Sequence, residues 1–366
     1  MLILRILIII KIVLLSSLLF SFNNRCSAQI INSSYKIMFW NLENFFDPFN
    51  DPSTSDDEFT PKGQRRWGWK RFAKKRNDIA KVIISTGEAV SSDNSISEIN
   101  YPVLIGLAEV ENHFVLEQLV KATPLAMLDY KIIHRDSPDE RGIDVALLYR
   151  RKYFKPVSIN YYPVITSDTS FKTRLILYVK GVLEELDTLH VFVNHWPSKF
   201  GGELISGPKR QAAAKKLRIA CDSIFQSNNK ANIVIMGDFN DTPDSDLFKK
   251  VIGTGVGNSN LYNLAIGIRR LGEGTIKYRA SWELIDMFFV SSNLLDKNEP
   301  ICCLDCAMRI FRPEFLFEED KIYLGKKPFR CYIGPRYNGG ISDHLPVILT
   351  IDKMWENPAK IGSFVP

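Results

Sequence analysis

The sequence predicts an α/β fold in which apolar strands alternate with helices. Short β-branched or apolar runs recur along the chain, and amphipathic stretches separate several of them. Such runs, about four to eight residues long, are typical of buried strands. Acidic, amide and imidazole side chains also follow these runs where each strand would end. Polar groups gathered at strand ends are typical of an α/β active site.

Residues 1–28 have the features of a secretory signal peptide. A basic start, an apolar run up to Phe22 and small residues before Gln29 predict cleavage after Ala28, and hence a secreted or periplasmic protein. An uncleaved membrane anchor is the alternative, because the apolar run is nearly long enough to span a bilayer. Cleavage lowers the formal charge from +6 to +3, which is too small for a protein held to nucleic acid by a large basic surface.

The remaining chain is long enough for one large domain or two ordinary ones. No internal repeat or long Gly/Ser/Pro linker follows Tyr35, so one domain over residues 35–353 is favoured. Five cysteines remain after cleavage, and an odd number does not predict a full disulfide framework. A bridge from Cys331 to Cys302 or Cys306 stays open, whereas the local cysteine spacing does not favour zinc.

The first predicted strand, Ile37 to Phe39, delivers Asn41 to the turn that follows. Residues 62–84 then predict an amphipathic helix with a basic outer face. A solvated face is the favoured interpretation over a phosphate-binding face. Trp67 and Trp69 are interleaved with arginines, which leaves contact with nucleic acid or lipid open.

A second buried strand, Val103 to Ala108, ends at Glu109. A carboxylate between a buried strand and a helix needs a partner, and a divalent cation is the obvious one. Asn112 is expected to cap the helix that begins at His113. Glu111 is expected to point the other way and to be exposed.

Two arginines lie near the next strands. Tyr130 to His134 and Asp144 to Tyr149 are expected to pair, with Arg141 in the turn between them. Arg174 is expected within a strand from Thr173 to Lys180. Arginines at these places suit bidentate phosphate binding, but they equally suit surface ion pairs.

The strand from Leu189 runs into Asn194 and His195, and a helix is expected from about Pro208. The β-branched run Ile233 to Ile235 then predicts a buried strand closed by Gly237. Asp238 and Asn240 follow it, and in extended geometry this spacing places both on one face. A carboxylate and an amide suit the orientation of a water for attack on an ester, although a plain turn is the alternative.

Asp286 lies just inside another apolar strand, and Ser342, Asp343 and His344 immediately precede the last one. Asp286 can therefore orient an imidazole, as a carboxylate does in a catalytic triad. No serine or cysteine nucleophile stands out, and Ser342 lacks a glycine-flanked elbow, so water is the expected attacker. One set then supplies two imidazoles and enough hard oxygens for a magnesium-like ion: Asn41, Glu109, His195, Asp238, Asn240, Asp286, Asp343 and His344.

The order of these motifs resembles the endonuclease/exonuclease/phosphatase superfamily, which includes pancreatic deoxyribonuclease, sphingomyelinases and inositol-phosphate phosphatases. The resemblance spans about Tyr35 to Lys353, and it implies a four-layer α/β sandwich with two mixed sheets face to face and helices outside. It rests on Trp40-Asn41-Leu42-Glu43-Asn44, Glu109-Val110-Glu111, Asn194-His195, Gly237-Asp238-Phe239-Asn240, Ile285-Asp286 and Ser342-Asp343-His344.

The resemblance implies a role for each matching residue. Glu109, Asn41 and Asp343 would bind Mg²⁺, with Mn²⁺ or Ca²⁺ as alternatives. Asp238 would activate water, held by Asn240. The phosphate side would be formed by His344, which Asp286 orients, and by His195. Substrate contacts are expected from Asn41, Arg141, Arg174 and Asn194, although Arg141 is not securely matched.

The expected function is a secreted, metal-dependent phosphodiesterase that acts as a nuclease. A phosphatase or phospholipase on small or lipid phosphoesters is the first alternative, and an inactive binding module of the same fold is the second. No stable protein partner is implied, and membrane contact is not favoured.

Overall fold

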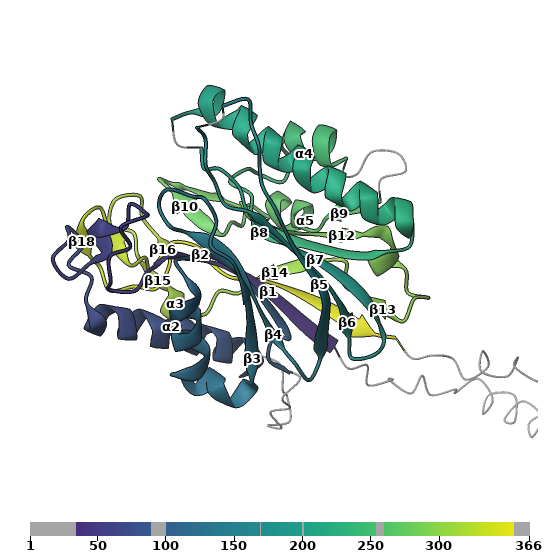
Figure 1. The fold of residues 1–366 in the computed structure, drawn as a ribbon, viewed down its shortest axis with the longest axis horizontal. Helices are drawn as coiled ribbons and strands as arrows, with labels where there is room; N and C mark the ends of the chain where they lie inside the picture. The colour runs from purple at the N-terminus through teal and green to yellow at the C-terminus, as the bar shows by residue number, and fades with distance from the viewer. Residues whose placement is uncertain (1–33, 89–99, 169, 200, 254–259, 355–366) are drawn as a thin grey trace, which may run out of the picture. The chain divides into compact units, whose positions relative to one another are not determined.

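Two mixed β-sheets pack face to face, with helices on their outer surfaces, as Figure 1 shows. This arrangement confirms the predicted α/β sandwich. The structure, a computed structural model, describes residues 34–88, 100–168, 170–199, 201–253 and 260–354, so the predicted signal peptide lies outside the described residues. Ser34–Met354 form one compact unit. Of the helices in these ranges, none is both long enough and apolar enough to cross a bilayer.

The first sheet has the strand order β13-β19-β1-β2-β4-β3, and β14 also pairs with β19. β1 and β2 are parallel, and the other pairs in this sheet are antiparallel. Its strands are β1 (Ser34–Phe45), β2 (Leu104–Val110), β3 (Tyr130–His134), β4 (Asp144–Arg150), β13 (Ile301–Cys302), β14 (Met308–Ile310) and β19 (Val347–Lys353).

The second sheet has the order β5-β6-β7-β8-β12-β9, in which only β7 and β8 are parallel. β6 begins at Ile176, so Arg174 precedes the strand that was expected to contain it. The strands are β5 (Phe154–Tyr162), β6 (Ile176–Leu183), β7 (Asp187–His195), β8 (Asn232–Asp238), β9 (Leu261–Asn263) and β12 (Asp286–Ser291).

The main core lies between the two sheets, where β1 and β2 face β7, β8 and β12. Phe39, Phe192 and Ile235 are fully buried there. The sheets approach closely at Gly106, where an added Cβ would lie 2.8 Å from the Met236 sulfur. This packing fixes how the ends of strands from the two sheets face each other.

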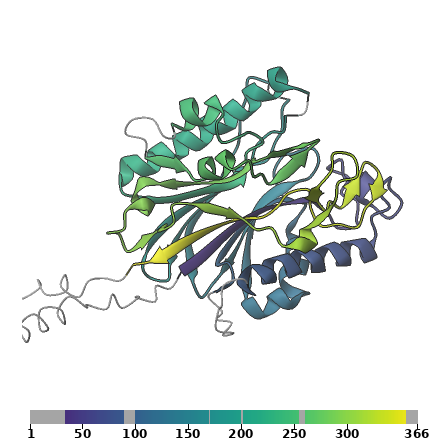
Figure 2. The same cartoon turned by 180° about the vertical axis from the view of Figure 1, so that it is seen from behind.

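Helices α2 (Trp69–Glu88) and α3 (His113–Lys121) cover the first sheet, and α4 (Glu203–Ser227) and α5 (Ala265–Arg270) cover the second, as Figure 2 shows from behind. Asn112 caps α3, as predicted, by accepting the Val115 amide at 3.1 Å. α2 begins only at Trp69, later than expected. α4 begins earlier than Pro208, which lies inside the helix. Proline is tolerated there because the backbone bond it removes falls near the exposed helix start.

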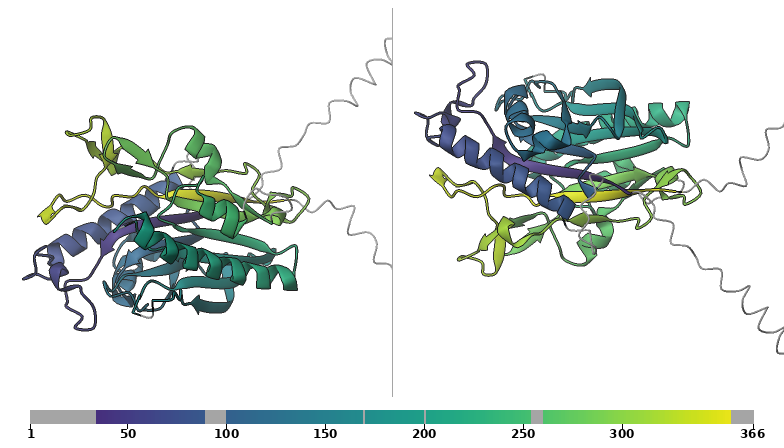
Figure 3. Two further views of the ribbon diagram at one scale, coloured as in Figure 1. Left: turned by 90° about the horizontal axis from the view of Figure 1, so that it is seen from above. Right: turned by 90° about the horizontal axis from the view of Figure 1, so that it is seen from below.

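Small hairpins gather on the side of the sheets where β1 ends and β19 begins, as Figure 3 shows. They are β10 (Ile276–Tyr278) with β11 (Ser281–Glu283), β15 (Phe317–Glu319) with β16 (Lys326–Pro328), and β17 (Tyr332–Ile333) with β18 (Arg336–Tyr337). Single turns complete the chain: η1 (Asp57–Phe59), η3 (Pro124–Leu128), η4 (Phe248–Ile252), η5 (Ser292–Leu295) and η6 (Glu314–Leu316). The five cysteines in the described ranges are free thiols, so neither candidate bridge is present.

Candidate active site

The candidate site lies where strands of both sheets end. Asn41 is in the last part of β1, Glu109 in β2, His195 at the end of β7 and Asp238 at the end of β8. β1 is parallel to β2 and β7 is parallel to β8, so each pair delivers its side chains to one edge. Asp286 begins the antiparallel strand β12 directly opposite Asp238.

Close approaches between side chains join these strand ends into one site. His195 Nε2 is 4.0 Å from Glu109 Oε1 and 3.7 Å from Asp238 Oδ2. His344 Nε2 is 3.9 Å from the same Asp238 oxygen and 4.0 Å from Asp343 Oδ1. Asp238 therefore lies between two imidazoles.

Asp238 is held as a hydrogen-bond acceptor in a buried position. Its Oδ2 accepts the Asn41 amide at 3.0 Å, and its Oδ1 accepts the Asn240 backbone N–H at 2.9 Å. Burial and the nearby charge of Asp286 raise the pKa of Asp238 to about 7. This carboxylate can therefore take up a proton near neutral pH, which suits a general base.

The two imidazoles are pushed toward opposite protonation states. Burial alone would lower the pKa of His344, but the charge and hydrogen bond of Asp286, 2.8 Å from His344 Nδ1, hold that pKa well above its usual value. Burial lowers the pKa of His195 well below its usual value, and the charges of Arg174 and Arg141 add to this effect. His344 is therefore a cation at neutral pH and His195 is neutral, a division typical of acid–base sites.

The oxygen donors near Glu109 fit a magnesium-like ion. Glu109 Oε2 accepts the Asn44 backbone N–H at 2.9 Å. Its Oε1 lies 3.7 Å from Arg141 and 4.0 Å from His195 Nε2. Asn41, in the neighbouring strand β1, has an amide oxygen that accepts the Glu43 backbone N–H at 3.0 Å, and Mg²⁺ prefers such hard oxygens. Asp238, Asp286 and His344 also lie close enough together to hold an ion. His344 Nδ1 and Asp286 Oδ2 already bond each other at 2.8 Å, and both Asp238 oxygens already accept N–H groups, so the Glu109 side has the more available oxygens.

The backbone is strained where the site residues leave their strands. Glu43, Asn44, Glu109 and Asn240 have φ angles of 50°, 57°, 57° and 51°. The pairing register shifts at the same places in β1 and β2. Left-handed non-glycine residues and β-bulges cluster at functional sites, where they aim side chains that regular strands would misdirect.

Two residues outside the predicted set, Arg330 and Glu43, hold Asp343 in place through ion pairs. Arg330 lies 2.9 Å from Asp343 Oδ2 and 3.2 Å from Glu43 Oε1, while Glu43 Oε2 accepts the Cys331 amide at 2.7 Å. Glu43 was visible as part of the Trp40-to-Asn44 motif. Arg330 was not, because it lies in a connection between hairpins that carries no recognisable pattern.

The predicted substrate contacts differ in their access to solvent. Arg141 is half exposed, and it donates to Asn44 Oδ1 at 2.7 Å. Arg174 is buried between Asp139, at 3.0 Å, and the Trp196 carbonyl, at 2.7 Å. Asn194 is fully buried, and its amide oxygen accepts the Trp196 indole N–H at 3.1 Å. Arg174 and Asn194 thus hold the loop after β7, and Arg141 is the one of the three that faces open space.

Glu111 is buried, so its expected exposure is wrong. Its side chain is 7% exposed, and its Oε2 accepts the Asp47 amide at 2.6 Å. The left-handed Glu109 breaks the alternation of the strand, so the direction of Glu111 does not follow from simple spacing. Burial, together with the charges of Asp47 and Asp56, raises the pKa of Glu111 to about 9.

We expect Glu111→Gln to stabilise the protein above pH 7 by up to about 3 kcal/mol. Folding takes up a proton at Glu111, because its pKa rises from 4.5 to about 9, so stability falls as the pH rises across that range. Glutamine removes this penalty, and its N–H₂ is suited to bond Asp56 Oδ1, which has no hydrogen-bond partner. Urea unfolding at pH 5 and pH 8 measures the gain, with the exposed Glu140→Gln as control. A gain for Glu111→Gln that is no larger at pH 8 than at pH 5 contradicts this account.

Comparison with known proteins identifies a matching family and solved structures with a similar fold. Residues 36–353 match the sequence model of the Endonuclease/Exonuclease/phosphatase family. Humanized TDP2 from D. rerio is 14% identical with a TM-score of 0.52, covering 87% of this chain and 99% of its own. The human Nocturnin catalytic domain is 16% identical with a TM-score of 0.52, covering 88% and 96%. A family protein from Bacteroides thetaiotaomicron is 15% identical with a TM-score of 0.53, covering 89% and 100%.

These structural likenesses show the fold alone, because the identities are low. A search among curated proteins gave no match. The family match nevertheless extends over nearly all of the residues that the structure describes, and it contains every strand end that forms the site. The chain therefore belongs to the endonuclease/exonuclease/phosphatase family.

Proposed function

We propose that the protein is a secreted, metal-dependent phosphodiesterase that hydrolyses nucleic acid. The observation that carries this proposal is the placement of buried Asp238, whose Oδ2 lies 3.7 Å from His195 Nε2 and 3.9 Å from His344 Nε2. A base and a cation at one point suit attack of water on a phosphoester, because the reaction releases a proton and adds negative charge.

In this proposal Asp238 takes the proton of the attacking water. Its pKa of about 7 leaves it partly ionised at neutral pH, so it can act as a base and later release the proton. Asn41 and the Asn240 backbone fix the two carboxylate oxygens, which leaves little freedom for the carboxylate to rotate.

His344 supplies a positive N–H for the charge that develops on phosphate, and Asp286 keeps that imidazole charged and oriented. One preorganised donor of this kind is typically worth about 2.7–4 kcal/mol in the transition state. A divalent ion bound by Glu109, Asn41 and Asp343 would add Lewis-acid stabilisation of the phosphoryl oxygens.

Nucleic acid is the favoured substrate because the half-exposed Arg141 borders the site, 3.7 Å from Glu109 Oε1. TDP2 from D. rerio, a similar fold, has been solved with a single-strand DNA product. The basic stretch of residues 62–84 adds little to the argument for nucleic acid. Trp67 is fully buried, and the Arg65 and Arg71 guanidinium groups lie 4.9 Å and 4.3 Å from the ring centroids of Tyr332 and Tyr337.

A lipid phosphoester is the second candidate, and one surface feature favours it. Ile322, Tyr323 and Leu324 are 77%, 45% and 77% exposed at the tip of the β15–β16 hairpin. The ion pair between Lys277 and Asp320, at 3.0 Å, fixes the base of that tip. Sedimentation with phosphatidylcholine vesicles tests it: loss of vesicle binding in Leu324→Ser, with DNA hydrolysis retained, would mark a lipid-facing tip.

Removal of divalent metal tests the proposed function. We expect EDTA to abolish hydrolysis of bis(p-nitrophenyl) phosphate and of single-stranded DNA, and excess Mg²⁺ or Mn²⁺ to restore both. A Glu109→Gln protein should need a higher metal concentration for half-maximal rate, because it loses an anionic ligand. Undiminished turnover in EDTA contradicts metal dependence, and the absence of any turnover by folded protein with metal supports a binding module instead.

A further inference from the structure

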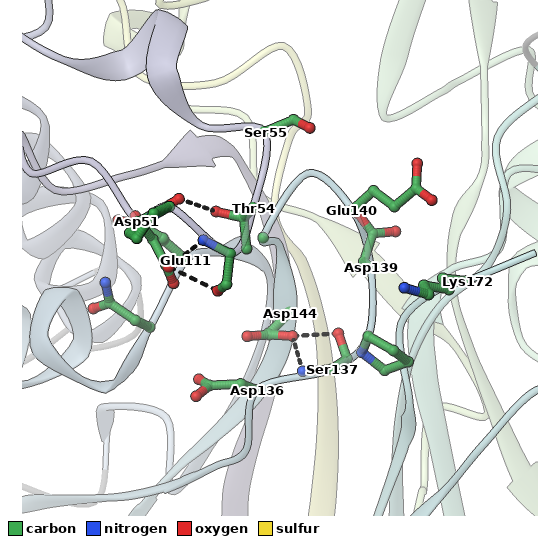
Figure 4. Close-up of a pocket in the computed structure, with 15 residues that line it drawn as sticks. Asp51, Thr54, Ser55, Glu111, Asp136, Ser137, Asp139, Glu140, Asp144 and Lys172 are labelled. Atoms are coloured by element: carbon green, nitrogen blue, oxygen red, sulfur yellow. Dashed lines mark hydrogen bonds between the residues drawn. The ribbon is translucent and has the colours of Figure 1, made fainter.

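Two cavities of opposite character flank the turn of residues 136–142. The first, of about 560 Å³, is shown in Figure 4 and is called here the acidic pocket. Lys172 is the one cation among its lining residues in the described chain. Its carboxyl groups are Asp51, Glu111, Asp136, Asp139, Glu140 and Asp144, of which Glu111, with its pKa of about 9, is uncharged at neutral pH. A polyanionic strand is repelled by such a wall.

The second cavity, of about 480 Å³, is called here the Lys209 pocket. Arg141, Lys172, Arg174 and Lys209 contribute to its lining. Three carboxylates also line it: Asp139, which pairs with Arg174 at 3.0 Å, Glu140, and Asp168, which accepts the Ser170 hydroxyl at 2.6 Å. Four cations against three carboxylates leave a small positive excess on this side of the turn, in contrast to the acidic pocket.

The Lys209 pocket also offers an aromatic surface. Phe171 lines it and is half-buried, and the Lys209 ammonium lies 4.3 Å from the Phe171 ring centroid. Aromatic rings beside basic groups are how proteins hold single-stranded nucleic acid, by base stacking together with phosphate contacts. The volume is in the range of sites that hold small organic ligands.

Two residues of the pocket wall lie beside catalytic groups. Arg141, on its inner wall, is 3.7 Å from Glu109 Oε1. Arg174, on the same wall, donates to the Trp196 carbonyl that also accepts the Asn240 side-chain amide at 3.0 Å. The Lys209 pocket therefore borders the side of the site formed by Glu109 and Asn240.

We propose that the Lys209 pocket binds the nucleotide next to the scissile phosphate, with its base against Phe171 and its phosphate at Lys172 and Lys209. This inference rests on the proposed function and names the substrate as single-stranded nucleic acid that leaves the site on this side of the turn. The acidic pocket excludes the other path by charge repulsion.

The test compares two substrates on the same enzyme. Bis(p-nitrophenyl) phosphate lacks a neighbouring nucleotide, whereas single-stranded oligothymidylate has one. For each protein, the specificity ratio is kcat/KM on oligothymidylate divided by kcat/KM on bis(p-nitrophenyl) phosphate. We expect Phe171→Ala and Lys209→Ala each to lower this ratio by about tenfold. Lys215→Ala, on the same helix but outside the pocket, should leave the ratio unchanged. For Lys209→Ala, the slope of log KM against log salt should also fall by about one.

Three results separate the two proposals. In the first, the wild type hydrolyses bis(p-nitrophenyl) phosphate, and Phe171→Ala and Lys209→Ala have the same specificity ratio as Lys215→Ala. This result contradicts nucleotide binding in the Lys209 pocket and leaves the proposed phosphodiesterase activity standing. A wild type that cleaves the small diester but not oligothymidylate also overturns the pocket. A folded, metal-loaded wild type that cleaves neither substrate overturns the proposed function, and the pocket with it.

Discussion

Asp238→Asn is expected to lower kcat for bis(p-nitrophenyl) phosphate by about 10²–10⁴-fold at neutral pH. The substituted amide cannot accept the proton of the attacking water, although it occupies the same space between His195 and His344. Substrate binding should change little, because Asp238 is buried and contacts protein groups through both oxygens. Steady-state kinetics with the small diester measure kcat separately from KM.

The folded state of this variant is the necessary control. Asp244→Asn, at an exposed carboxylate in the following turn, provides the matched substitution and should keep wild-type turnover. Thermal unfolding should show that both proteins are folded at the assay temperature. Turnover by folded Asp238→Asn within a few-fold of wild type removes Asp238 from the role of base.

Asp286→Asn is expected to move the whole pH–rate profile to lower pH and to reduce the maximal rate. In the wild type, activity should rise as Asp238 ionises, with a pKa of about 7, and fall as His344 loses its proton at higher pH. The charge of Asp286 raises the pKa of both groups. Its removal therefore lowers both pKa values, and the acidic and basic limbs should shift in the same direction.

This joint shift distinguishes an electrostatic role from simple support of the imidazole. A support role predicts a lower kcat with both limbs in place. His344→Ala serves as the comparison, because it should lose the basic limb altogether and move the acidic limb to higher pH, since the charge of His344 lowers the pKa of Asp238. A profile for Asp286→Asn that is scaled down but not displaced contradicts the proposed charge of His344.

The positions of the main site residues follow from the sequence because strand ends are locally encoded. The apolar runs before Glu109, His195 and Asp238 set where each strand stops, and parallel pairing brings the neighbours to one edge. Pairing across the two sheets is not local. The approach of His344 to Asp286 joins residues 58 positions apart, and it was inferred from chemistry together with family resemblance rather than from spacing.

Other features could not be read from the sequence for identifiable reasons. The burial of Glu111 depends on the left-handed backbone at Glu109, and nothing in a strand pattern announces such a bulge. The role of Arg330 depends on how the hairpins fold over β1, which is a tertiary arrangement. A solvated face was favoured for the basic residues of the stretch 62–84, yet Lys75 within it is 1% exposed and donates to the Glu43 carbonyl.

The left-handed residues at the strand ends have a consequence for engineering. Each of Glu43, Asn44, Glu109 and Asn240 holds a backbone conformation that costs of order 1–3 kcal/mol, so the surrounding core must enforce it. Glycine at Asn44 would relieve that local tension and yield a more heat-resistant protein. It would also remove the Asn44 Oδ1 that accepts from Arg141, while the backbone N–H that bonds Glu109 would stay, so durability and turnover are set against each other at this one edge.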